Sequence, residues 1–366
     1  MLRICFVFLL FLVYINTSFS QEGGLNVYGH FRTDLGVSSI FSNDHVIRYS
    51  YFGRNVLRLE FENADTTYGK LEGSVDFNIL SGDYRNLLVY TSNAFVIAKD
   101  VILSFDIRKL YLMVRFDWFD LLIGRQLMKF GYGIVFSPIS FFDKIDLSDV
   151  KFSRIGIDAI RFKVLLSEID SFDVIAIPKV DITNSTFAGR LVFRIFNFEG
   201  DSVISYFGDD NYLRCGFALK TDLEIGIYGE FVYNYHNELS NRYFEFVFGA
   251  DYSLFDKLIL RLEYYYNSFT NESLYLLTNP NSYFELGQYV MVQITYSFDL
   301  FSSLNLSLIK DLEYEGFWIT LSYGKNLFQD VNFVLDIRFL NGNMISFLPI
   351  SDFGYLSVSS GLELRF

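Results

Sequence analysis

The chain has 366 residues, of which 51% are hydrophobic, 19% aromatic and 20% charged, and its formal net charge is −13. This acidic balance excludes nucleic acid as a partner, because phosphate binding needs a basic surface. Apolar and charged residues are interleaved, and beyond residue 20 no apolar run approaches the roughly eighteen residues of a membrane-spanning helix. A helical membrane protein is therefore excluded as well.

Residues 1–20 predict a secretory signal peptide. Arg3 supplies a positive charge, Ile4–Ile15 form an apolar stretch, and small residues stand at positions 18 and 20. This order is typical of a cleaved signal, and we expect cleavage before Gln21. Residues 21–366 then form one domain, whose single cysteine, Cys215, leaves no internal disulfide to hold it.

Apolar and polar side chains alternate through most of this domain. In 290–299, for example, Val290, Val292 and Ile294 share one parity, and Gln293 and Thr295 take the other. A period of two indicates strands with one apolar face. Such runs give eighteen candidate strands, at 25–36, 47–62, 68–79, 104–116, 121–128, 157–165, 172–178, 187–198, 202–207, 212–220, 223–235, 243–253, 257–267, 287–299, 304–312, 317–324, 331–340 and 355–366. Sixteen strands is the alternative, because 172–178 and 202–207 are short.

The connections between these strands alternate in length. The longer ones include 80–103, 129–156, 268–286 and 341–354, and the shorter ones include 117–120, 199–201, 221–222 and 255–256. Bacterial outer-membrane barrels have an even strand number, short periplasmic turns and longer outer loops. The sequence therefore predicts an all-β fold, a transmembrane antiparallel β-barrel in the bacterial outer membrane, with lipid around it and both termini on the periplasmic side.

One predicted strand changes parity along its length. Ser104, Asp106 and Arg108 are polar at even positions, whereas Arg115 and Asp117 are polar at odd ones. One extra residue in a ladder has this effect, so we expect a β-bulge near position 109.

The final strand has a regular apolar face. Leu356, Val358, Leu362, Leu364 and Phe366 share one parity. A terminal aromatic residue after such a face resembles the signature by which the barrel-assembly machinery recognises its clients. Phe366 is therefore predicted to be an assembly signal, with that machinery as a partner.

Charged residues on the polar parity are expected to line the lumen. The basic ones come from the middle strands, at Arg115, Arg125, Arg161, Arg190, Arg194 and Arg214. The acidic ones come from strands on either side, at Glu60, Glu72, Asp76, Glu224, Glu230, Glu245 and Glu263. Walls of opposite charge would select solutes that pass through a wet pore. Alternatively, these side chains pair with one another and fill the lumen.

No catalytic, cofactor or metal site is expected. The three histidines, His30, His45 and His236, are far apart and lack the spacing of metal ligands. An enzyme is therefore not predicted.

Residues 124–162 carry the most specific pattern. A run of Gly124, Arg125 and Gln126 leads into a loop with Gly131, Gly133, Phe136 and Pro138, then Phe142 and Asp143, and a strand opening with Gly156, Asp158 and Ala159. This resembles a broad group of bacterial outer-membrane porin-like barrels. Phe130 stands where that group commonly has Trp, and Ser137 where it commonly has Asn.

The resemblance implies that the third outer loop, 129–156, folds into the pore. Its composition agrees, because Phe130, Tyr132, Ile134 and Phe136 are too apolar for a loop in water. The expected constriction residues are Asp143, Lys144, Asp146 and Asp149.

The sequence thus predicts an outer-membrane porin, a passive diffusion channel for small polar or charged solutes, with a homotrimer left open as its assembly. The alternative is a barrel with a closed lumen that acts as a structural anchor or surface-interaction protein. A barrel enzyme is the third and weakest interpretation.

Overall fold

A computed structural model of the chain describes residues 25–42, 45–63, 68–82, 94–98, 101–142, 156–209, 211–236, 241–269, 287–313, 316–341 and 354–366. The signal segment 1–20 lies outside these residues and stays a prediction. No helix among the described residues is long and apolar enough to cross a membrane.

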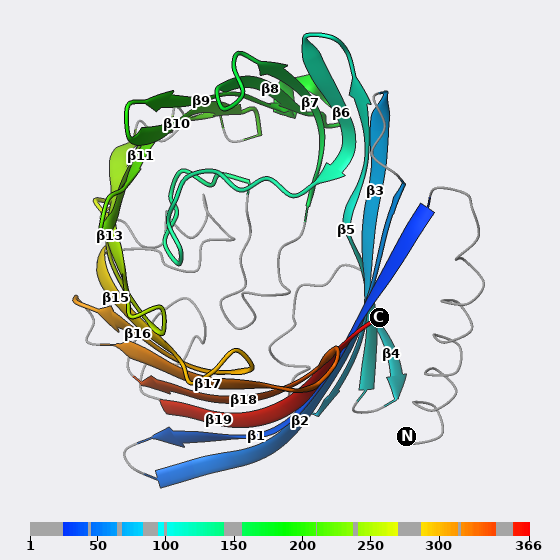
Figure 1. Cartoon of the computed structure of the whole chain (residues 1–366), viewed down its shortest axis with the longest axis vertical. Coiled ribbons are helices and arrows are strands. Elements are labelled where there is room, and N and C mark those ends of the chain that lie inside the picture. The colour runs from blue at the N-terminus through cyan, green and yellow to red at the C-terminus, as the bar shows by residue number, and fades with distance from the viewer. Residues whose placement is uncertain are drawn as a thin grey trace.

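The strands form one antiparallel sheet that closes on itself, because the last strand pairs with the first (Figure 1). In the described residues the ring contains eighteen strands: β1 (Leu25–Ser42), β2 (His45–Asn63), β3 (Gly69–Gly82), β5 (Val101–Arg115), β6 (Phe119–Gln126), β7 (Ile157–Leu165), β8 (Ser171–Ile177), β9 (Thr186–Ile195), β10 (Phe198–Phe207), β11 (Tyr212–Asp222), β12 (Gly226–His236), β13 (Asn241–Leu254), β14 (Leu258–Asn267), β15 (Gly287–Ser297), β16 (Ser302–Asp311), β17 (Phe317–Phe328), β18 (Val331–Asn341) and β19 (Gly354–Arg365). A short strand, β4 (Ala94–Ala98), pairs with β5 alone.

The count of eighteen is confirmed, and the alternative of sixteen is wrong. The two short candidates are wall strands with a partner on each side: β8 lies between β7 and β9, and β10 lies between β9 and β11. Sequence reasoning missed β4, which lies within the predicted outer connection 80–103. It also placed a turn at 199–201, although these residues belong to β10 and the turn is at Phe196–Asn197.

The bulge in β5 is confirmed. Ser74 pairs with Lys109 while Val75 pairs with Ile107, so Arg108 is the extra residue. The side chains of Arg108 and Lys109 both reach acidic groups on the lumenal side, Asp76 and Glu72. The bulge therefore places two neighbouring cations on one face of the strand.

The outer face of the ring is apolar. On β12, Ile227, Phe231 and Tyr233 point outward and are exposed, whereas Glu230 and Val232 point inward and are buried. Exposed apolar side chains also occupy the tips of four short connections at one end of the ring, those that follow β5, β9, β13 and β15: Trp118, Phe196, Phe255 and Leu300. We call this end the short-connection end. A closed sheet with its apolar side outward is suited to lipid rather than to water.

Candidate functional site

The chain leaves the wall after β6 and runs into the interior of the ring (Figure 1). We call residues 127–142, which form no strand, the inner segment. Its two ends, on either side of the tip at Phe136, pack on a layer of small and branched side chains that six consecutive strands, β7–β12, present to the lumen. Met128, Phe130, Ile139 and Phe142 meet a wall layer of Ala159, Ile175, Ala188, Val203, Ala218 and Val232.

The tip of the inner segment contacts the next group of strands. Phe136 stacks on Tyr265, with ring centroids 5.2 Å apart, and lies 5.9 Å from the ring of Tyr289. Buried side chains of β12–β16, among them Met291, complete this second cluster. The inner segment thus covers the lumenal face of about half the wall. Inside the barrel, these contacts remove apolar side chains of both the wall and the segment from water.

Three wall carboxylates accept hydrogen bonds from the backbone of the inner segment. Asp201 on β10 accepts from the Gly131 amide at 2.9 Å. Glu230 on β12 accepts from the amides of Tyr132 and Gly133, both at 2.6 Å. Glu263 on β14 accepts from the next three amides, at 2.5, 3.0 and 3.1 Å, from Ile134, Val135 and Phe136. Six consecutive peptide N–H groups are therefore satisfied by the barrel wall.

Two of the predicted lumenal arginines also contact the inner segment. Arg190 pairs with Asp201 at 2.7 Å, and its guanidinium lies 4.5 Å from the centre of the Phe130 ring. Arg214 pairs with Glu245 at 3.0 Å and lies 4.3 Å from the centre of the Phe141 ring. Planar guanidinium groups can hold a carboxylate and cover an aromatic face at the same time. Both arginines are therefore packed between wall and segment.

The other described arginines of this group lie beside acidic or polar neighbours. Arg161 pairs with Asp173 at 2.5 Å, and Arg194 pairs with Glu199. Arg115 lies opposite Asp120 at the β5–β6 hairpin. The predicted separation of basic and acidic walls is therefore wrong for these side chains, since the basic strands carry their own carboxylates.

The acidic residues of β2 and β3 are paired in the same way. Asp76 accepts two hydrogen bonds from Arg58, both at 2.7 Å. Glu72 contacts Lys70 and Lys109 and accepts from the Tyr111 hydroxyl at 2.6 Å. Glu60 lies 3.8 Å from Arg108. These residues form a lumenal network of alternating charge on the side of the ring away from β7–β12.

The structure corrects two predicted pore-lining residues. Arg125 pairs across the ladder with Leu110 and Asp158, and Leu110 is 42% exposed on the outer face. Directly paired residues share one face of a sheet, so Arg125 points outward, where it forms a bidentate pair with Asp158 at 2.5 and 2.9 Å. Glu224 lies in the exposed turn between β11 and β12 and not on a strand.

Where β6 ends, hydrogen bonds from Arg125 and from Gly156 continue the pairing of the wall with β5. Its guanidinium donates to the Ile107 carbonyl at 3.2 Å, and the Gly156 amide donates to the Arg108 carbonyl at 2.8 Å. The first bond joins β6 to β5, and the second joins β5 to the residue just before β7, beyond the last residue of β6. The GRQ run recognised in the sequence thus marks the point at which the chain turns inward.

The predicted constriction residues Asp143, Lys144, Asp146 and Asp149 lie outside the described residues. The contacts above concern only 127–142, so the inward fold of the whole loop 129–156 stays a prediction. Sequence reasoning placed Glu230 and Glu263 on the lumenal face but missed their contact with the inner segment. The one local signal was that each is the only acid on the inward parity of its strand.

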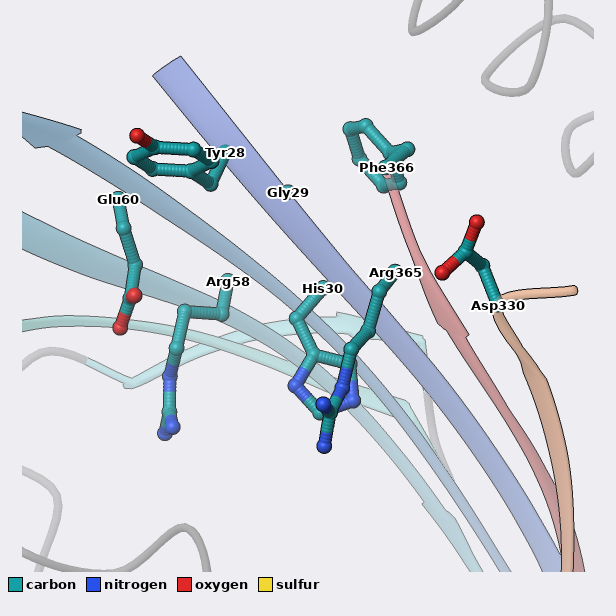
Figure 2. Close-up of a pocket in the computed structure, with 8 residues that line it drawn as sticks. All are labelled: Tyr28, Gly29, His30, Arg58, Glu60, Asp330, Arg365 and Phe366. Carbon is teal, nitrogen blue, oxygen red and sulfur yellow. The ribbon is translucent and has the colours of Figure 1, made fainter. Parts of the chain in front are cut away.

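A cavity of about 500 Å³ lies beside the seam between β1 and β19. Figure 2 shows Arg58, Glu60 and His30 pointing from β1 and β2 to the same side, with Arg365 beside His30. His30 Nε2 lies 2.8 Å from a carboxylate oxygen of Glu363. Charged side chains therefore also line the lumen close to the short-connection end of the ring. Among the described residues no group of three potential metal ligands comes together.

Comparison with known proteins gives a likeness of fold. No family model matches the sequence, and no curated protein matches it. Among solved structures, OccK7 (OpdD) of Pseudomonas aeruginosa matches with a TM-score of 0.61 and 8% identity over 94% of this chain and 99% of the other. OccAB4 of Acinetobacter baumannii matches with a TM-score of 0.57 and 11% identity over 93% and 98%. OmpF of Salmonella typhi, in a complex with daunomycin, matches with a TM-score of 0.51 and 12% identity over 93% and 97%. These structures are outer-membrane porins, and the chain shares their closed barrel.

Proposed function

We propose that this protein is a porin of the bacterial outer membrane through which small polar or charged solutes diffuse, and that the inner segment narrows its lumen. The observation that carries the proposal is a closed ring with an apolar outer face and a charged inner face. The fold of this ring matches that of a known porin over 94% of the chain. Outer-membrane lipid and the barrel-assembly machinery are its proposed partners, and a homotrimer is a proposed assembly.

A specific observation favours the second candidate, a barrel with a closed lumen. The described arginines of β7–β11 are paired with wall acids, and the inner segment packs against roughly half of the ring. Paired charges can fill a lumen as well as line a pore. The two candidates differ in whether ions cross the barrel.

Single-channel recording tests this difference. The refolded protein in a planar bilayer is expected to give discrete, ohmic current steps, because the charged network on β2, β3 and β5 keeps that side of the lumen polar. The same protein unfolded in detergent is the control. Insertion of folded barrels without any current step would reject the porin and leave the anchor.

The outward ion pair predicts a stability effect in the membrane. Replacing Asp158 by Asn leaves the Arg125 guanidinium unpaired on the outer face, where a lipid-facing Arg costs about 2–4 kcal/mol near the bilayer centre. We expect the free energy of unfolding, measured by denaturant titration in lipid vesicles, to fall by up to that amount. The double variant Arg125→Leu/Asp158→Leu should recover most of the loss. An equal loss in the single and double variants would show that the pair does not face lipid.

A further inference from the structure

We propose that Glu230 and Glu263 are positioning residues that fix the inner segment against the wall, so that it acts as a rigid narrowing and not as a movable flap. The consequence for conduction rests on the proposed porin function. The positioning itself does not, because it can be measured without any ion flow.

The backbone of the inner segment forms a binding site for anions. Successive peptide N–H groups that point to one side make a concave site of positive partial charge, which in other proteins receives phosphate or another anion. Here amides 132–136 all donate to the two glutamates. The Ile139 amide at 3.4 Å and the Ser137 hydroxyl at 3.1 Å also donate hydrogen bonds to Glu230. The wall thus supplies the anion that this backbone binds.

The two glutamates depend on the inner segment in return. Their exposed fractions are 3% for Glu230 and 0% for Glu263, and within the described part of the chain neither forms an ion pair. A buried carboxylate is costly unless hydrogen bonds or an opposite charge stabilise it. For Glu263 the remaining donor is the Tyr228 hydroxyl at 2.6 Å. Asp201 differs, because Arg190 balances its charge. A partial displacement of the segment that admits no water would therefore leave both carboxylates without most of their donors.

The strands between the acids leave room for the backbone to approach. Ladder pairing places Ala218 between Asp201 and Glu230. Beside Glu263 it places Gly249, and the space over this glycine is filled by the ring of Tyr228, whose hydroxyl donates to Glu263. On the segment side, Gly131 has a φ of +72°, and a Cβ atom there would collide with the Glu230 carboxylate. Small residues on both sides thus permit a contact that is made by main-chain atoms. A main-chain contact fixes the path of the segment more tightly than flexible side chains would.

The test replaces both acids by their neutral isosteres and measures where the segment lies. Each Gln presents one acceptor and one NH₂ donor, and that donor opposes the peptide N–H groups of 132–136. Segment position is measured by disulfide trapping between Ile139→Cys and Gly216→Cys in a Cys215→Ser background. A Cβ at 216 would lie 2.7 Å from Cγ1 of Ile139, one bond from its Cβ, which brings the two Cβ atoms close to the ~3.5–4.5 Å of a disulfide.

In the parent protein we expect rapid and nearly complete trapping. In Glu230→Gln/Glu263→Gln we expect trapping to slow severalfold, together with larger and noisier current steps. The matched control is Glu62→Gln, which removes a carboxylate on β2 that pairs with Lys70 on β3, distant from the inner segment. This control should trap like the parent. Unchanged trapping in the double Gln variant would overturn the inference.

Two other outcomes of this experiment also have a definite interpretation. If the double Gln variant does not yield a folded barrel, Gly131→Ala decides, because it leaves both acids in place while its Cβ blocks the contact of the segment with Glu230. Unchanged trapping in that variant would again overturn the inference. If trapping responds as expected while the parent shows no current, the porin function fails and the positioning role stands.

Discussion

Replacing residues 131–150 by a short Gly-Ser linker is expected to raise the single-channel conductance severalfold and to weaken ion selectivity. The replaced residues include the part of the inner segment that covers β10–β16, with Phe136 and Ile139 buried against the wall. They also include the predicted constriction residues Asp143, Lys144, Asp146 and Asp149. Without this material the lumen should be wider, and Asp201, Glu230 and Glu263 would face water.

The measurement is the conductance of the refolded variant in a planar bilayer, with the ion preference taken from the reversal potential in a salt gradient. Glu230→Gln/Glu263→Gln serves as the comparison, because it frees the segment without removing it and should give a smaller and noisier increase. A linker variant with parental conductance would mean that the segment lies off the conduction path. The closed-lumen anchor would then become the better interpretation.

Removing Phe366 is expected to lower the yield of folded protein in the membrane severalfold, while barrels that do assemble keep the parental conductance. Phe366 closes the seam between the last and first strands: its backbone exchanges two hydrogen bonds with Gly29, at 2.7 and 2.9 Å. A side chain at position 29 would collide with the Phe366 ring, so the ring lies directly over that glycine on the outer face. Loss of this contact weakens the joining step on which closure depends.

Two controls separate packing from recognition by the assembly machinery. Gly29→Val keeps Phe366 in the chain but fills the space over position 29 that its ring occupies, whereas Phe366→Tyr keeps an aromatic ring there. If packing at the seam is what matters, Gly29→Val should lower the yield like the deletion, both in cells and in refolding from denaturant. If only the deletion acts, and only in cells, Phe366 serves as a recognition signal. Normal yields for both the Phe366 deletion and Gly29→Val would contradict both roles.

The strands could be predicted from the sequence because their signal is local. Side chains alternate between the two faces of a strand, and in a barrel one face meets lipid, so a period of two appears in each of the eighteen wall strands. The Arg108 bulge was predictable for the same reason, since an inserted residue exchanges the parities within a single run. Even the short strands β8 and β10 were found in this way, although β4 has too few residues to show any alternation.

Which charges lie together was decided only by the tertiary structure. Arg125 was assigned to the lumen from the parity of its predicted strand, but ladder pairing with Leu110 and Asp158 turns it outward. The partners of Glu230 and Glu263 lie about a hundred residues away, in main-chain N–H groups that carry no sequence signal. Closure of the ring brings these groups together, and a backbone donor is the same for every residue except proline. The sequence therefore determined the strands of the barrel wall, and only the tertiary structure determined which groups the charged side chains of the wall contact.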